Sequence, residues 1–467
     1  MRCADQRPVA DHDWHTLSPA TAPGRISRRA LLATGAAAWA SSGLSIAAGT
    51  ADRDPLLITQ HPGIAQRRDA ALAVLRPSET HLDRGLTLHR ASLVFDAYGF
   101  APRAAVDPVR LSAAIDAGAS ETELQDLREE MSMTQAAVVD AERAEFVEAM
   151  RCAGVTCIFQ NAGEEGQDPL RLMKRLARFT HLSDALRGTL VRASLPSDIV
   201  HAKASGQHCL YLTGNGVPLP AQFMTVPEEL GYIRLFFQLG IRMMHVTYNR
   251  RNLLGDGCAE PANGGLSDLG RAAIAEMNRV GVIVDVAHSG WRTSLEAAEA
   301  SCKPMVASHT VCGGLRQHIR AKPDEVIKAI CDTGGLVGIC WIPTFVGGNG
   351  GITALLDHVD YAVGKFGADH VAIGTDVAHT SQHAAAAAAQ VVSRPSQRAR
   401  TRYEALWPDG ALGGNWPEAT SLAWTNWPLV TVGLVQRGYS DDVIRKILGG
   451  NMLRVCRDVL PEHLQSR

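Results

Sequence analysis

Short apolar runs alternate with longer amphipathic segments along most of the chain. The short runs are rich in aliphatic and β-branched residues, and their length suits buried strands better than helices. The longer segments bring apolar positions onto one stripe, which is typical of helices that cover a sheet. The eight runs lie at 93–97, 155–160, 209–213, 243–247, 282–287, 305–308, 336–341 and 371–375. Strands that alternate with helices predict a parallel sheet, and eight such units favour an α/β fold of the closed (β/α)8 TIM-barrel type.

The front of the chain does not resemble part of that barrel. Arg28 and Arg29 form a twin-arginine signature, and an Ala-rich apolar stretch follows at 31–48. This stretch is short, is interrupted by glycine and has no basic stop after it, so a removed leader is favoured over a spanning helix. We therefore expect a leader over 1–51 and export to the periplasm by the twin-arginine route, with a disordered tail as the alternative. Residues 52–90 are expected to precede the barrel, and 91–467 to form it together with C-terminal helices.

Composition narrows the class of protein. The 467 residues carry a formal net charge of −2, with no basic stripe that would indicate nucleic-acid binding. A hydrophobic content of 46% and a charged content of 20% are typical of a soluble, enzyme-sized globule. The ten cysteines form no CxxC pair or metal-finger spacing. No GxGxxG follows the first run, which disfavours a dinucleotide-binding sheet.

Histidines follow two neighbouring runs, and an aspartate follows a third. His288 and His309 come after the fifth and sixth runs, and Asp376 comes after the eighth. In a parallel barrel the carboxyl ends of all strands share one rim, so these side chains are expected to lie close together. Two neutral imidazoles and a carboxylate suit a cation such as Zn²⁺ that activates water. The alternative is a pair of hydrogen-bonded rim histidines without a metal.

Other polar residues follow the same strands. Arg320, beyond the sixth run, is expected to face the site and bind a substrate carboxylate, although a solvated loop arginine is the alternative. Tyr248 and Asn249, after the fourth run, are candidates for an oxyanion donor and a substrate contact, or they pack the rim. Asp285 is expected to orient or support the site rather than to bind metal.

Four segments carry a resemblance to a known family. They are GLSDLGRAAIAEMNRVGVIVDVAHSG, KPMVASHT, HIRAKPDEVIKAICDTGGLVGI and GLVQRGYSDDVIRKILGGNMLRV. Over about 93–460 the chain resembles the membrane (renal) dipeptidase family of zinc peptidases. The resemblance implies a (β/α)8 barrel of the metal-dependent hydrolase type, hydrolysis of dipeptides, and frequent dimerisation. By position it implies that His288 and His309 bind the second metal, that Arg320 holds the substrate carboxylate and that Asp376 is the catalytic aspartate.

The chain departs from the family where the first metal is bound. The His-x-Asp pair of the first strand is replaced by Tyr98 and Phe100, and the bridging glutamate by Gly214 or Thr213. Tyr248 stands where the family has a histidine that steadies the reacting centre. We therefore expect one zinc ion, held by His288 and His309, with a second ion in doubt.

Three functions stay open on the sequence alone. The first is a metallo-dipeptidase that cleaves small carboxylate-bearing amides, with Asp376 and Tyr248 as catalytic residues and Arg320 and Asn249 as substrate contacts. The second is a weakened or inactive barrel that binds such a ligand. The third is an amidohydrolase or lactonase of another specificity on the same rim. Metal content separates the second from the other two.

Overall fold

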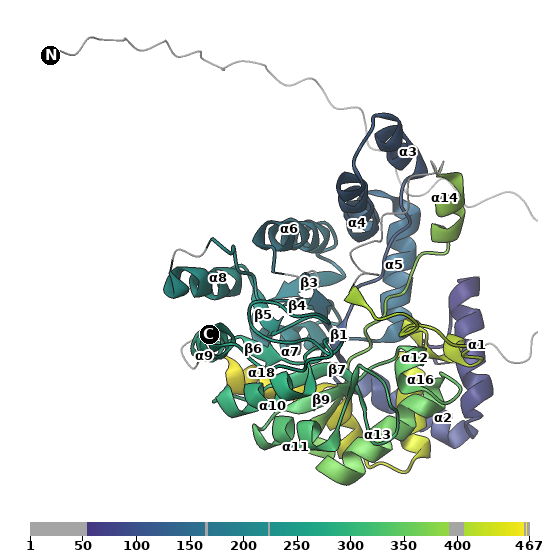
Figure 1. Ribbon diagram of the computed structural model, residues 1–467. Helices are drawn as coiled ribbons and strands as arrows, with labels where there is room; N and C mark the ends of the chain where they lie inside the picture. Colours follow the sequence, from purple (N-terminus) through teal and green to yellow (C-terminus); the bar gives the residue numbers. More distant parts are fainter. Residues whose placement is uncertain (1–53, 164–166, 223–224, 392–405, 462–463, 465–467) are drawn as a thin grey trace, which may run out of the picture. The chain divides into compact units, whose positions relative to one another are not determined.

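The computed structural model of the chain describes residues 54–163, 167–222, 225–391, 406–461 and 464. Its centre is a parallel sheet whose strands follow one another in chain order and curve into a barrel (Figure 1). The eight strands of this path are β1 (Phe95–Gly99), β2 (Cys157–Asn161), β4 (His208–Gly214), β5 (Ile241–His245), β6 (Ile283–Asp285), β7 (Val306–Cys312), β9 (Leu336–Ile339) and β10 (Val371–Ile373). The predicted (β/α)8 fold is confirmed. The predicted leader lies outside the described residues.

The sheet closes between its first and last strands without a ladder of backbone bonds among the described residues. Instead, Asp376 N donates to Tyr98 O at 2.9 Å. The buried carboxylate of Asp96 accepts from Thr375 N at 2.9 Å and from Thr375 Oγ1 at 2.6 Å. Side chain and backbone together therefore join β10 to β1.

The strand boundaries differ from the predicted runs in two places that matter for the site. β7 extends to Cys312, so His309 lies inside the strand rather than after it. β6 ends at Asp285, so His288 lies in the turn beyond it. Two short strands were not predicted: β3 (Leu190–Ala193) pairs with β4, and β8 (Ala321–Lys322) pairs with β7.

Helices surround the strands and precede them. Those described are α1 (Pro62–Leu75), α2 (Glu79–Ala91), α3 (Pro108–Asp116), α4 (Glu121–Val138), α5 (Asp140–Ala153), α6 (Pro169–Ala185), α7 (Pro196–Ala204), α8 (Val226–Gln238), α9 (Asp268–Val280), α10 (Trp291–Ala300), α11 (Asp324–Asp332), α12 (Pro343–Val346), α13 (Ile352–Phe366), α14 (Ala384–Gln390), α16 (Trp427–Gln436), α17 (Asp441–Arg445) and α18 (Asn451–Val459). α9 shows why the sequence forms them. Ser267 Oγ caps its first turn by accepting from Gly270 N, Ile274 and Met277 are buried on one face, and Gly281 ends it at φ 97°.

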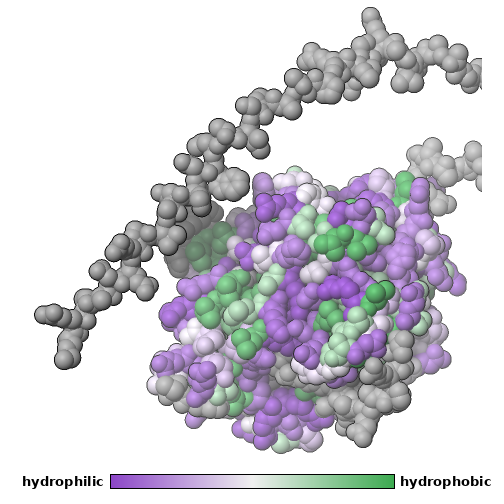
Figure 2. Space-filling view, turned by 90° about the horizontal axis from the view of Figure 1, so that it is seen from above, coloured by the Kyte–Doolittle hydropathy of each residue, from purple (hydrophilic) through white to green (hydrophobic). Residues whose placement is uncertain are grey.

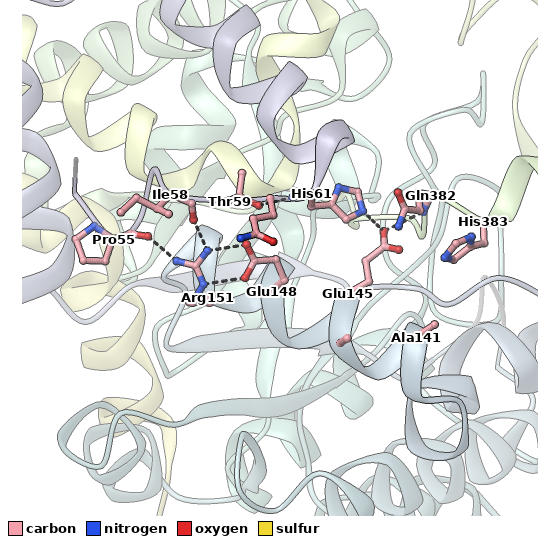
Figure 3. A pocket seen from close by; sticks show the side chains of 12 residues that line it. Pro55, Ile58, Thr59, His61, Ala141, Glu145, Glu148, Arg151, Gln382 and His383 are labelled. Carbon is pink, nitrogen blue, oxygen red and sulfur yellow. Dashed lines mark hydrogen bonds and ion pairs between the residues drawn. The ribbon is translucent and has the colours of Figure 1, made fainter. Parts of the chain in front are cut away.

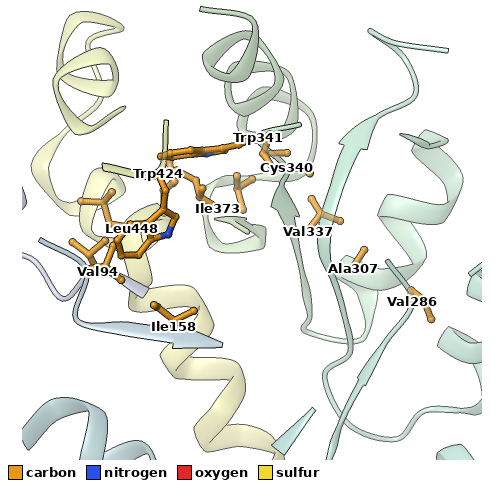
Figure 4. Close-up of a cluster of buried hydrophobic side chains, with 14 of the residues drawn as sticks. Val94, Ile158, Val286, Ala307, Val337, Cys340, Trp341, Ile373, Trp424 and Leu448 are labelled. Atoms are coloured by element: carbon orange, nitrogen blue, oxygen red, sulfur yellow. The ribbon is translucent and has the colours of Figure 1, made fainter. Parts of the chain in front are cut away.

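The core has an inner and an outer layer. Inside the barrel, side chains of the strands pack together, and Phe95, Tyr98, Phe159 and Tyr211 are the largest of them. Met452 and Val455 of α18 join this layer, so α18 covers the amino-terminal end of the barrel. Outside, alternate strand residues pack against the helices, and Figure 4 shows part of this layer with Val337 and Ile373 on neighbouring strands. The carboxyl ends of the strands are left for the site.

The described part of the outer surface shows no single large hydrophobic area on the face that Figure 2 presents. The face shown in Figure 2 is mainly hydrophilic, with small hydrophobic patches separated from one another. Among the described residues, no helix combines the length and the apolar character that crossing a bilayer requires.

Candidate metal centre

Two buried imidazoles meet at the carboxyl end of the barrel. His288 and His309 are 3% and 0% exposed, and their Nε2 atoms lie 2.9 Å apart. Strand register brings them together, because β6 and β7 are neighbours in the sheet. The sequence-based expectation that these two residues lie side by side is therefore met.

The far nitrogens of both rings are already engaged. His288 Nδ1 lies 2.7 Å from Asn249 Oδ1, and His309 Nδ1 lies 2.8 Å from Ser308 Oγ. A ring that donates from Nδ1 keeps its lone pair on Nε2. Burial, followed by the positive charge of Arg320, holds the pKa of both imidazoles well below their usual range. Both rings are therefore neutral. Asn249 Oδ1 can only accept, so His288 donates from Nδ1 and its Nε2 lone pair faces His309 Nε2, whereas Ser308 Oγ can accept or donate. When His309 also donates from Nδ1, both Nε2 lone pairs point to one position between the rings. The arrangement fits one metal ion.

A third histidine, missed by the sequence analysis, lies behind this pair. His245 of β5 belongs to the same cluster, with one ligand atom from each of the three rings within 4.8 Å of the others. However, its Nδ1 lies 3.1 Å from Gly214 O and its Nε2 lies 3.0 Å from Asp285 Oδ2. Both nitrogens therefore face oxygen acceptors, and the ring fits an ion-paired donor better than a ligand. Its position inside an apolar strand gave no sign of this pairing, although the supporting role expected of Asp285 agrees with it.

Asp285 has further partners. It is fully buried, and its Oδ1 accepts from Ala287 N at 2.9 Å and from Ser308 N at 3.1 Å. Burial opposes its charge, but His245 and these bonds lower the pKa of its carboxyl. It thus fixes the turn that carries His288 and the strand that carries His309.

Two tyrosines flank the imidazole pair. The ring of Tyr98 stacks on His309 with centroids 3.9 Å apart, and that of Tyr248 stacks on His288 at 4.1 Å. Tyr98 and Phe100 occupy the positions from which a first metal would be bound, and Gly214 at the end of β4 offers no side chain. Phenyl and glycine supply no ligand atom, so the residues present do not fit the complete two-metal set.

Asp376 stands at the edge of the pair. Its Oδ2 lies 4.0 Å from His309 Nε2, and its side chain is 21% exposed. The backbone holds it at φ 57°, a conformation that residues other than glycine adopt rarely and that marks functional sites. The carboxylate therefore faces the open side of the imidazoles.

Asn249 and Arg320 lie behind the site rather than on its surface. Asn249 is fully buried, and its Oδ1 also accepts from Cys258 Sγ at 3.2 Å. Its position therefore suits orientation of His288, which differs from the substrate contact expected. The loop is held close by Gly257, where a Cβ would come within 2.0 Å of Tyr248 O.

Arg320 keeps unmet hydrogen-bonding capacity. It is 1% exposed, its Nη2 donates to His309 O at 2.9 Å, and its guanidinium lies 5.3 Å from the centre of the Phe345 ring. Nε and Nη1 have no hydrogen-bond partner among the described residues. A buried guanidinium with free donors beside the imidazoles is suited to an anion.

A pocket of about 420 Å³ opens over these residues. Tyr98, Tyr248, His288 and Asp376 form one part of its lining, and Phe345 and Trp407 another. The volume suits a ligand of a few tens of atoms at most. The candidate catalytic side chains therefore face one enclosed space.

A second cluster of metal-binding residue types lies elsewhere, beside a cavity of about 590 Å³ (Figure 3). Glu145 Oε1 lies 2.8 Å from His379 Nε2 and 3.1 Å from His61 Nε2. However, His61 Nδ1 accepts from Ile64 N at 3.1 Å and caps α1, so a neutral ring carries its proton on Nε2. That nitrogen has no lone pair for a metal. The cluster is a hydrogen-bonded connection between α1, α5 and the segment after β10.

Comparisons with known proteins show the family and the fold of the chain. A family model described as membrane dipeptidase (peptidase family M19) matches residues 87–388. Dipeptidase tcpJ of Claviceps purpurea is 27% identical over 232 residues, which are 49% of this chain and 47% of that protein. Dipeptidase verJ of Clonostachys rogersoniana is 28% identical over 239 residues, which are 50% and 52% of the two chains. The chain thus spans about half the length of these relatives.

Solved structures share the fold. An amidohydrolase from Pseudomonas aeruginosa aligns with a TM-score of 0.58 and 26% identity, over 80% of this chain and 98% of that one. The probable dipeptidase PvdM from the same organism aligns with a TM-score of 0.55 and 18% identity, over 83% and 99%. The second likeness concerns the fold alone.

Proposed function

Because this chain belongs to the membrane dipeptidase family, peptidase family M19, we propose that it is a metallo-dipeptidase. Its substrates are dipeptides or similar small amides that carry a free carboxylate. The observation that carries the proposal is the close approach of the Nε2 atoms of His288 and His309, 2.9 Å apart, beside Asp376 at the pocket.

The family's peptidases depend on zinc, and we propose a single ion here. His288 and His309 would hold it, because their Nδ1 atoms are fixed by Asn249 and Ser308. What a bound zinc supplies is Lewis-acid activation of water and of the amide carbonyl. Tyr98 and Phe100 supply neither of the charged or imidazole ligands that would hold a second dication against its neighbour.

The protein's own groups handle substrate and protons. Asp376 lies where its carboxylate can take a proton from the attacking water and return it to the departing amine. Tyr248 lines the pocket and stacks on His288, and we propose that its hydroxyl donates to the developing oxyanion. The free Nε and Nη1 donors of Arg320 are suited to the substrate carboxylate.

Metal analysis tests this function directly. We expect about one equivalent of zinc in the wild type and a loss of most of it in His288→Ala. His201→Ala is the control, because His201 is exposed on α7 and far from the pocket lining. Two equivalents in the wild type would mean that other residues replace the missing ligands. Absence of metal together with tight binding of a dipeptide would replace the enzyme with a ligand-binding barrel.

We also propose that the chain is exported by the twin-arginine route to the periplasm. The support is Arg28 and Arg29 followed by an apolar stretch at 31–48.

A further inference from the structure

One wall of the pocket carries charged side chains of both signs, because Glu129 and Asp376 line the pocket together with Arg103 and Arg175. Glu129 of α4 pairs with three arginines of α6: with Arg171, with Arg175 Nε at 3.3 Å and with Arg178 at 3.5 Å. Arg178 and Lys174 also pair with Asp126. Glu129 is therefore shared among three guanidinium groups.

Arg175 has capacity that its ion pair does not use. The side chain is 9% exposed, it lines the pocket, and its Nη1 is buried without a hydrogen-bond partner among the described residues. An unmet donor on a buried cation costs free energy unless a ligand fills it. This donor therefore indicates an anion-binding position.

Arg103 lies on the same wall. It follows β1, its guanidinium lies 4.5 Å from the centre of the Phe100 ring, and it lines the pocket. Within the described part of the chain its guanidinium forms no hydrogen bond or ion pair; only its backbone is bonded, to His379 and Ser381. Arg103 is exposed and rests against an aromatic face, and its donors are available to a ligand in the pocket.

Two amides complete the lining. Asn161 at the end of β2 and Asn215 after β4 are 4% and 3% exposed, and each has a buried Oδ1 without a hydrogen-bond partner among the described residues. Their loops are in close contact, since a Cβ at Gly163 would come within 2.0 Å of Asn215 N. Whichever way each amide is turned, it offers an unused polar atom to the pocket.

We propose that Arg103 and Arg175 form an anion subsite that selects substrates with a second carboxylate. This inference rests on the proposed function. Arg320 follows β7, whereas Arg103 and Arg175 follow β1 and β2, on the other side of the imidazole pair in the strand order. A substrate whose terminal carboxylate binds Arg320 therefore extends its amine-side residue toward this wall. That residue carries an acidic side chain, such as glutamate or aspartate.

A matched pair of substrates tests the subsite. L-glutamyl-L-alanine and L-glutaminyl-L-alanine differ by one charge at equal size. We expect kcat/KM to favour the glutamyl substrate by about tenfold or more, as one charge-assisted contact would give. Arg103→Gln should remove most of this preference by lowering kcat/KM for the glutamyl substrate, while kcat/KM for the glutaminyl substrate stays within about twofold. Equal values for both substrates in the wild type would overturn the inference.

Direct binding separates this inference from the function on which it rests. Calorimetric titration of the zinc-loaded protein should show L-glutamate binding more tightly than L-glutamine, and Arg103→Gln should abolish the difference. This result in a protein that cleaves neither dipeptide would sustain the subsite and reject the peptidase. Tighter binding of inorganic phosphate than of L-glutamate would overturn the carboxylate assignment.

The choice of variants separates a lost subsite from a loss of folding. Arg175→Gln removes a partner of the buried Glu129, so its effect is interpreted only if its melting temperature matches that of the wild type. Arg103→Gln breaks no hydrogen bond or ion pair of the side chain among the described residues and loses only the contact with the Phe100 ring, so it carries the test alone if Arg175→Gln is unstable. Arg292→Gln, on the exposed face of α10, is the control and should leave the preference unchanged.

Discussion

Single hydrogen bonds decide what each imidazole of the site can do. Asn249 Oδ1 and Ser308 Oγ engage the Nδ1 atoms of His288 and His309, and the two Nε2 atoms face each other at 2.9 Å. His245 has the same chemistry and the opposite outcome, because Gly214 O and Asp285 face both of its nitrogens. The surroundings of a histidine, and not its presence, make it a ligand here.

Asn249→Ala should therefore weaken zinc binding by about 10–100-fold, since His288 loses the acceptor that fixes its tautomer and ring orientation. Asn249→Asp keeps an acceptor at this position and should bind zinc close to the wild-type affinity. Competition with a chromophoric chelator measures both. Unchanged affinity in Asn249→Ala would show that packing alone orients the ring.

Arg320→Ala should weaken the binding of ligands with a free carboxylate by about 1.5–3 kcal/mol, because a charge-assisted bond is lost. The corresponding carboxamides should lose much less. Inhibition constants of L-alanine and L-alaninamide give the comparison, with Arg292→Ala as a surface control. An equal loss for acid and amide would assign Arg320 a purely structural role through its bond to His309 O.

The sequence predicted the residues whose position on the rim is set by strand order alone. His288, His309 and Asp376 follow recognisable apolar runs, so their meeting could be expected before any coordinates. The roles of Asn249 and His245 could not be predicted in this way. They depend on the atoms that each side chain meets in the folded protein: His288 Nδ1 for Asn249, and Gly214 O and Asp285 Oδ2 for His245. Nor could Arg175 be predicted as part of the pocket, since α6 reaches it only through tertiary packing.

At the scale of elements, buried polar contacts fasten segments that are far apart in the sequence. Glu145 of α5 accepts from His379 beyond β10 and from Gln382 N at 2.9 Å, and it faces His61 at the start of α1. Burial opposes the charge, but the bonds from His379 and Gln382 outweigh it and lower the pKa of Glu145 to about 2. The connection therefore needs an ionised carboxylate.

A carboxyl group whose pKa is lowered by folding adds stability above its unfolded pKa of about 4.3 and loses it as the pH falls toward 2. Glu145→Gln should thus be less stable than the wild type at pH 7, by about 1.5–3 kcal/mol for the charged hydrogen bonds lost. The difference should shrink as the pH falls below about 4. Denaturant melts at several pH values measure it.

Glu276→Gln, which removes only the Arg279 pair on α9, is the matched control and should show little change. A stability difference for Glu145→Gln that stays constant from pH 7 to pH 3 would rule out the ionised form as its cause.

Strands and helices were the most predictable elements, because period and length alone distinguish them. Each of the eight predicted runs overlaps a strand of the barrel. β3 and β8 were not predicted because each is short and pairs with one neighbour only. The extension of β7 past His309 also needed tertiary context, since polar residues at 308–310 are buried there without an apolar signal.

For the whole molecule, the export proposal concerns Arg28 and Arg29, which lie outside the described residues, and it has its own test. Replacing both Arg28 and Arg29 by lysine should leave the precursor in the cytoplasm, because the twin-arginine pair is the recognition signal. Cell fractionation with a periplasmic marker measures this. Normal periplasmic accumulation of the double variant would end the proposal.

The junction between β10 and β1 has a mechanical consequence. The boundary between β10 and β1, here called the seam, depends on Asp376 N, Tyr98 O and the Asp96 carboxylate rather than on a ladder of backbone bonds. Local opening of the seam therefore requires only these few bonds to break together. The two residues that face each other across the seam also carry the carboxylate and one of the aromatic rings beside the imidazoles. Each opening of the seam therefore separates Asp376 from Tyr98 and disrupts the candidate catalytic centre. The hydrogen-exchange rate of the Asp376 amide would measure how often this opening occurs.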